Sequence, residues 1–184
     1  MKSHVTGRVI RRAAGTAAIW GLLLAVASGC GEKIPERYRP FFDLPTDKQR
    51  DSLLRYPIAE QLEVYSIGMR VIRPPPMYLA RFIATNGPTA IPAILARLRT
   101  VEDDYDRSDL ILILERMVCL EGVDLRKEPQ TIDAIREAIA GMPPDQARDV
   151  AETELATITD GCVTKSLRAR ERFDRLRHLD SSRQ

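Results

Sequence analysis

The chain has 184 residues, of which 28 are Lys or Arg and 26 are Asp or Glu, so its formal net charge is +2. The first 29 positions hold four basic and no acidic residues, which leaves 24 basic and 26 acidic residues in the remainder. This near balance excludes a general electrostatic affinity for nucleic acid, and we expect no nucleic-acid partner.

The first 29 residues have the pattern of an export signal. Basic residues at positions 2, 8, 11 and 12 lead into an apolar run, Ala13–Ser28, and the small residues Ala27-Ser28-Gly29 precede Cys30. The run is about 16 residues long, shorter than the ~20 that a membrane-spanning helix needs. This order resembles the lipobox of bacterial lipoprotein precursors. The alternative is an uncleaved anchor in which Cys30 is an incidental thiol.

The lipobox resemblance implies a signal peptide over residues 1–29, cut between Gly29 and Cys30. It also implies that fatty-acyl chains such as palmitate are attached at Cys30, so that membrane lipid is the first partner. Two or three acyl chains anchor a protein far more firmly than one. Gly31 follows the cysteine, where Asp would favour the inner membrane of a Gram-negative cell. The resemblance therefore implies an exported protein on the periplasmic face of the outer membrane, if the organism has one.

Residues 30–45 are interpreted as the lipidated cysteine followed by a flexible tether. Prolines at 35, 40 and 45 and mixed charges favour an extended segment without a core of its own. Phe41 and Phe42 are its apolar side chains, and we expect them to dock on the domain that follows, residues 46–184.

The first half of this domain predicts four helices. Thr46 and Gln49 fit a capping box that opens a helix to Tyr56. The next helix starts at Pro57 and ends before three consecutive prolines at 74–76, which lack the amide proton that a helix requires. A third helix spans Met77–Thr85 and ends at Asn86-Gly87, and a fourth follows Pro88.

The second half predicts four more helices. The first runs from a cap at Ser108 to Gly122 and is apolar over more than half of its surface, so we expect it at the centre of the core. Others run from Pro129 to Gly141 and from Pro143-Pro144 to Gly161, and the last spans Val163–Leu179. No segment alternates with period two, so the fold class is all-α.

Helix starts near 76, 108 and 143 are 32 and 35 residues apart, which is typical of a repeat of helix pairs. The segment Asn86–Leu98, with its Ala-Ile-Pro and paired aliphatic residues, resembles HEAT-type repeats, and the resemblance covers Met77–Gly122. It implies antiparallel helix pairs stacked as a short superhelix, and by fold analogy a protein-binding role. An irregular helical bundle is the alternative.

Two cysteines remain after Cys30. Exported proteins meet an oxidising compartment, in which Cys119 and Cys162 could form a disulfide. Two buried free thiols are the alternative, because the sequence does not show whether the Cα atoms lie within ~7 Å.

The sequence contains little that suggests catalysis or metal binding. After residue 29 the only histidine is His178, and we find no nucleophile elbow, P-loop or dinucleotide-binding pattern. We therefore expect no catalytic residue, no metal and no cofactor, and not an enzyme. Asp104, Asp106, Ser108 and Glu115 have the spacing of an EF-hand loop, but Asp109 stands where that loop needs Gly. The preferred interpretation is a solvated turn of Asp103, Asp104 and Asp106 before a helix capped by Ser108.

Residues 165–184 hold seven basic and three acidic residues, which suit either an anionic surface or the solvated face of a terminal helix. Together these features predict a membrane-anchored envelope lipoprotein whose helical domain binds a partner protein of the envelope. A helical domain with a pocket for a small ligand or a reaction is the second hypothesis. A purely structural part of a larger envelope assembly is the third.

Overall fold

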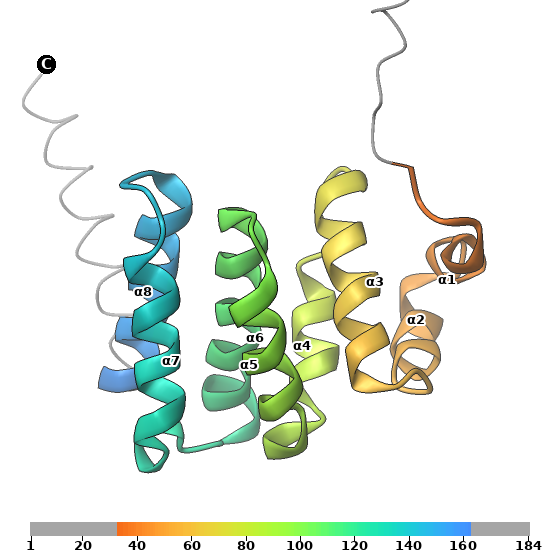
Figure 1. Ribbon diagram of the computed structural model, residues 1–184. Coiled ribbons are helices and arrows are strands. Elements are labelled where there is room, and N and C mark those ends of the chain that lie inside the picture. The colour runs from red at the N-terminus through yellow and green to blue at the C-terminus, as the bar shows by residue number, and fades with distance from the viewer. Residues whose placement is uncertain (1–32, 163–184) are drawn as a thin grey trace, which may run out of the picture. The chain divides into compact units, whose positions relative to one another are not determined.

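The computed structural model describes residues 33–162, and all regular structure in this range is helical, which confirms the all-α prediction (Figure 1). Its α-helices are α1 (Arg39–Phe42), α2 (Thr46–Leu53), α3 (Ile58–Val71), α4 (Tyr78–Ala84), α5 (Ile91–Thr100), α6 (Asp104–Glu121), α7 (Pro129–Ala140) and α8 (Gln146–Asp160). Short 3-10 turns lie at Glu36–Tyr38, Gly87–Ala90 and Leu125–Lys127. None of the helices in this range is long and apolar enough to cross a bilayer. The expected helix Val163–Leu179 lies outside the described residues.

From α3 onward the helices alternate between two layers (Figure 1). One layer contains α3, α5 and α7, and the other contains α4, α6 and α8. Successive helices therefore form antiparallel pairs, and their apolar faces meet between the layers. The second helices of the pairs begin at Tyr78, Asp104 and Gln146, which are 26 and 42 residues apart, so the near-equal spacing predicted from the sequence was wrong.

Helix α6 lies at the centre of the core, as its apolar surface predicted. It packs most extensively on α8 and α4 within its own layer and also contacts α5 in the other layer. The side chains that it buries completely are Leu110, Ile111, Ile113, Leu114 and Met117. Gly122 ends the helix at a φ of 70°, a left-handed conformation that favours glycine, and its amide donates to the carbonyl of Met117.

The start of α6 differs from the prediction. The helix begins at Asp104, four residues before Ser108, and its cap is Asp103, whose carboxylate accepts from the amide of Asp106 at 2.9 Å. A capping carboxylate satisfies a free amide and lies at the positive end of the helix dipole. Asp106 is only 3% exposed, so the expected solvated turn was wrong, and the continuous helix leaves no room for an EF-hand loop.

Helix α2 begins at Thr46 but without the expected capping box. Gln49 instead turns back, and its amide nitrogen donates to the carbonyl of Leu44 at 2.9 Å. Its amide oxygen accepts from the hydroxyl of Tyr78 at 2.6 Å. This side chain therefore connects the start of α2 to α4.

Of the flexible tether predicted over residues 30–45, the part that the structure describes, from Lys33, is folded against the domain. Glu36–Phe42 is helical, and both Tyr38 and Phe41 are 1% exposed. Both rings pack edge-on against Tyr56, with centroids 6.3 and 6.4 Å away. Prolines and charges predict a tether here, but Tyr38 and Phe41 are buried through contacts with residues later in the chain, which the local sequence does not show.

Phe42 also docks, and it lies against a glycine of α3. A Cβ atom at Gly68 would lie 3.1 Å from the Phe42 ring and 2.9 Å from Pro76. Only glycine leaves room for this approach, so Gly68 is part of the seat on which the N-terminal segment packs.

We predict that Phe41→Ala lowers the free energy of unfolding by about 3–5 kcal/mol, because it leaves a cavity under the N-terminal segment. Arg39→Ala, at an exposed position of the same short helix, is the matched control and should change it by less than about 0.5 kcal/mol. Urea unfolding followed by circular dichroism measures both. Equal, small effects of the two variants would mean that residues 36–42 are a tether after all.

Candidate functional site

A cleft lies between the C-terminal end of α3 and the N-terminal end of α6. Its volume is about 530 Å³. The α3 side contributes Met69, Arg70 and Arg73, followed by Pro75, and the α6 side contributes Asp103, Tyr105, Asp106 and Asp109. It combines the exposed aromatic ring of Tyr105 with the buried charge of Asp106.

The two arginines of the cleft both have partners. Arg70 donates from Nη1 to Oδ2 of Asp106 at 2.5 Å, and the Asp106 side chain is only 4% exposed. Arg73 donates to the carbonyls of Met69 and Ile72 at 3.1 and 2.8 Å, and so caps the C-terminal end of α3. The charge of Arg70 is therefore paired within the domain, whereas Arg73 is exposed and keeps its positive charge at the end of α3.

Asp109 differs from the other carboxylates of the cleft. It is half-buried on α6, and its carboxylate makes no hydrogen bond or ion pair with any described residue. Burial, together with the smaller effects of the neighbouring charges of Asp106 and Asp103, raises the pKa of Asp109 to about 7. The cleft thus contains a carboxyl group that changes charge near neutral pH.

Two buried polar atoms beside Asp109 have no hydrogen-bond partner in the described structure. One is Oδ1 of Asp106, and the other is the hydroxyl of Tyr65 on α3. Asp109 interacts electrostatically with that hydroxyl: burial is the largest cause that raises the pKa of Tyr65, and the charge of Asp109 is the second largest. Unsatisfied buried polar atoms are rare in folded proteins and often mark a functional site.

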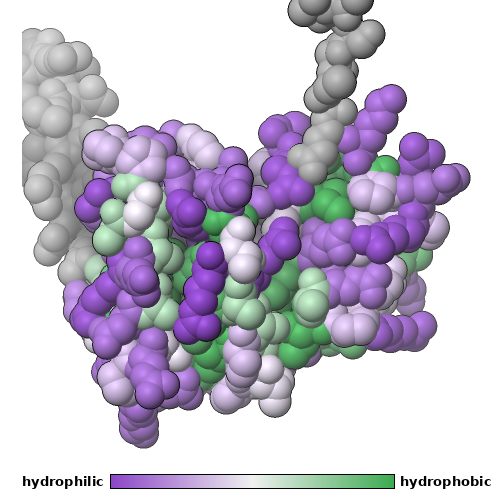
Figure 2. Space-filling view, in the orientation of Figure 1, coloured by the Kyte–Doolittle hydropathy of each residue, from purple (hydrophilic) through white to green (hydrophobic). Residues whose placement is uncertain are grey.

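A second, smaller hollow of about 310 Å³ lies between α5 and α7. Its floor is apolar, from Leu95, Leu98 and Ala138, and Arg99 and Glu137 lie among its lining residues. Figure 2 shows a similar arrangement over the α3–α5–α7 layer, where apolar surface lies between rows of hydrophilic side chains. No buried polar group without a partner lines this hollow.

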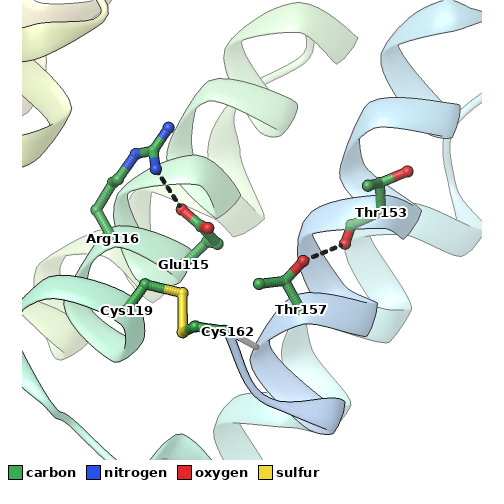
Figure 3. The surroundings of a disulfide bond; sticks show 6 residues. All are labelled: Glu115, Arg116, Cys119, Thr153, Thr157 and Cys162. Atoms are coloured by element: carbon green, nitrogen blue, oxygen red, sulfur yellow. Dashed lines mark hydrogen bonds and ion pairs between the residues drawn. A yellow bond between two sulfur atoms is a disulfide. The ribbon is translucent and has the colours of Figure 1, made fainter. Parts of the chain in front are cut away.

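At the opposite end of α6 a disulfide joins Cys119 to Cys162, just beyond α8 (Figure 3). The Cα atoms are 5.5 Å apart although the cysteines are separated by 43 positions in the sequence, so the distance that the sequence left open is within the range of a disulfide. Nearby, Glu115 is buried and pairs with Arg116 at 3.3 Å, and the Thr157 hydroxyl donates to the carbonyl of Thr153 at 3.0 Å. The bond fastens the end of α8 to α6.

The residues singled out by the sequence fall into three groups. Gly29, Cys30, His178 and the basic segment 165–184 lie outside the described residues. Cys119 and Cys162 are joined. Asp103 and Asp106, which were expected in a solvated turn with Asp104, line the wall of a cleft together with Asp109. Their spacing of three is the signal that could have placed them on one helix face, whereas Arg70 and Tyr65 carry no such signal.

No group of three or more histidine, cysteine or acidic side chains among the described residues is placed to hold a metal ion. Comparisons with family models, with curated proteins and with solved structures find no match to this chain. The chemistry of the cleft is therefore argued from its own geometry.

We predict that Asp109→Asn stabilises the domain increasingly as the pH rises from about 4 to 7. The raised pKa means that the folded wild type binds this proton more tightly than the unfolded chain, so its contribution to stability is lost over that range. The free energy of unfolding of the variant should exceed that of the wild type by on the order of 2–4 kcal/mol at pH 8.

Urea titrations at pH 4, 5, 6, 7 and 8 measure this difference. Asp133→Asn, which removes an exposed carboxylate of α7, controls for the loss of a negative charge. A difference between Asp109→Asn and wild type that is constant from pH 4 to 8 would contradict the prediction.

We further predict that Cys119→Ser lowers the free energy of unfolding by about 4 kcal/mol, the chain-entropy value for a loop of this length. Cys162→Ser should have the same effect, and the double variant should cost no more than either single one, because each removes the same bond. If the decrease in the free energy of unfolding of the double variant instead equals the sum of the two single decreases, the cysteines are two independent free thiols.

Proposed function

We propose that this protein is an exported lipoprotein, anchored to a membrane by acyl chains on Cys30, whose helical domain binds a partner protein of the cell envelope. The anchor rests on the lipobox resemblance of Ala27-Ser28-Gly29-Cys30. The Cys119–Cys162 disulfide supports export by an independent route, because such bonds persist mainly in oxidising compartments outside the cytosol.

The observation that carries the binding role is the cleft between α3 and α6. Tyr105 is 59% exposed and lines this cleft, together with Met69 and the two arginines, Arg70 and Arg73. Tyr, Met and Arg are the residue types that are enriched in protein interfaces. A cleft so composed can accept a side chain of a partner, whereas the described residues offer no group of metal ligands or nucleophile with its base.

The folded start of the domain adds a constraint on the partner. Only three peptide bonds separate Cys30 from Lys33, where the compact unit begins, and an extended chain covers at most about 3.8 Å per bond. With acyl chains on Cys30, so short a connection would keep the domain close to the bilayer. The partner is therefore expected to be a membrane protein or another membrane-anchored protein.

One observation favours the second hypothesis, a pocket for a small ligand or a reaction. A carboxyl group with a pKa of about 7 is suited to general acid–base work, and Asp109 lies in a cleft large enough for a small ligand. The unpartnered Tyr65 hydroxyl and Asp106 Oδ1 lie beside it, and we keep this hypothesis as the alternative.

The experiment combines the anchor and the cleft. The full chain is expressed in a bacterium that processes lipoproteins, with a photo-crosslinking benzoylphenylalanine in place of Tyr105. Irradiation should yield one discrete crosslinked protein in the membrane fraction. The same side chain in place of Val150, which is 42% exposed on α8 and away from the cleft, should not yield it.

Mass spectrometry of the purified chain should find an N-terminal Cys30 that carries two or three acyl chains. Cys30→Ala should abolish acylation and weaken the crosslink, because the local concentration near the membrane falls. An intact Met1 or an unmodified Cys30 sulfur would overturn the anchor. No crosslink from position 105, together with a rise in melting temperature on adding envelope metabolites, would favour the small-ligand hypothesis.

A further inference from the structure

The charges of the cleft do not balance once the internal pairs are counted. Arg70 pairs with Asp106, and Arg73 caps backbone carbonyls of α3. Asp103 uses Oδ1 to accept the Asp106 amide, which leaves it negatively charged at the edge of the cleft. Asp109 has no partner. Two arginines thus face three carboxylates in the cleft lining, so the cleft carries one excess negative charge when Asp109 is ionised.

The surroundings of Asp109 make this excess negative charge costly. On its own helix it faces Asp106 and Asp103, and both charges oppose its ionisation. From α3 it faces the neutral hydroxyl of Tyr65 and, across Asp106, the guanidinium of Arg70. From α5, Arg97 acts on Asp106, while no cation is among the groups that act on Asp109. A partly buried carboxylate without a counter-ion is destabilised unless a donor reaches it.

A second observation points to the kind of donor. Oδ1 of Asp106 belongs to a side chain that is 96% buried and lines the cleft, and it accepts no hydrogen bond among the described residues. A guanidinium offers five N–H donors and an ammonium three, so either could serve more than one carboxylate at once. Tyr105 and Met69 provide an aromatic face and an apolar edge for the stem of a long basic side chain.

We propose that the cleft between α3 and α6 receives a lysine or arginine side chain of the partner protein, with Asp109 as the carboxylate that pairs with it. This inference rests on the proposed function, since it names the chemistry by which the partner is held. In this arrangement Tyr105 lies over the aliphatic stem of the partner's side chain, and Asp103 attracts its positive charge at the entrance of the cleft. The Arg70–Asp106 pair forms the inner wall of the cleft.

Binding of a cation at Asp109 is coupled to loss of its proton. The protonated carboxyl predominates below pH 7 and attracts a cation weakly, whereas the ionised form predominates above pH 7. A basic side chain favours the ionised form, so binding releases a proton and should become tighter as the pH rises from 6 to 8. With a pKa near 7 the ionised fraction, and hence the affinity, should rise about tenfold over this interval.

The test uses the full chain in detergent micelles and two labelled peptides of glycine and serine, one with a single arginine and one with citrulline in its place. Citrulline has nearly the same shape as arginine but no charge. At pH 8 fluorescence anisotropy should show about tenfold tighter binding of the arginine peptide, and at pH 6 most of this preference should vanish.

Two variants locate the effect. Asp109→Asn should abolish the preference for arginine at both pH values, and Asp133→Asn, the exposed carboxylate of α7, should preserve it. Asp109→Asn is expected to fold, because it removes an unpaired buried charge, and circular dichroism checks this. Tyr105→Ala should weaken binding of the arginine peptide severalfold without changing its pH dependence.

Equal binding of the two peptides, or an arginine preference that survives Asp109→Asn, would overturn the inference. Free agmatine that binds as tightly as the arginine peptide would assign the cleft to a small cation and would also overturn it. Such a failure is distinguishable from failure of the proposed function: if the inference alone is wrong, the crosslink from position 105 remains and is unchanged by Asp109→Asn.

Discussion

The domain depends on the burial of α6. This helix packs on α4, α5 and α8, and its apolar side chains fill the space between the two layers. Complete burial of five large apolar side chains contributes on the order of 10 kcal/mol of hydrophobic stabilisation, which is comparable to the whole net stability of a domain of this size. The other helices can be understood by how they cover α6.

A helix buried on several sides has few places for polar groups, and α6 keeps its polar functions at its two ends. At the N-terminal end the capping Asp103 and the buried Asp106 hold the first turn and meet Arg70 of α3. At the C-terminal end the disulfide from Cys119 fastens the end of α8. The middle of the helix contributes buried apolar side chains to the core. The cleft and the covalent link are thus at opposite ends of one helix.

The start of the domain matters for function as much as for stability. Tyr38 and Phe41 are buried against Tyr56, so the chain is ordered almost from the point where the lipidated cysteine is expected. A long flexible tether would let the domain search far from a bilayer, whereas so short a connection restricts it to partners at the surface. The proposed anchor and the proposed cleft are in this respect parts of one arrangement, in which geometry and charge together select the partner.

The sequence by itself determined the all-α class, the order of the helices and most of their ends, because proline, glycine and apolar spacing act locally. It also identified α6 as the central helix from its composition alone. The burial of Tyr38 and Phe41, the pairing of Asp106 with Arg70 and the meeting of Cys119 with Cys162 were decided only by the tertiary structure. These contacts join residues that are 15 to 43 positions apart. The pKa of a carboxyl group such as Asp109 depends on which charges and apolar groups the fold brings around it, and a local sequence pattern does not show them.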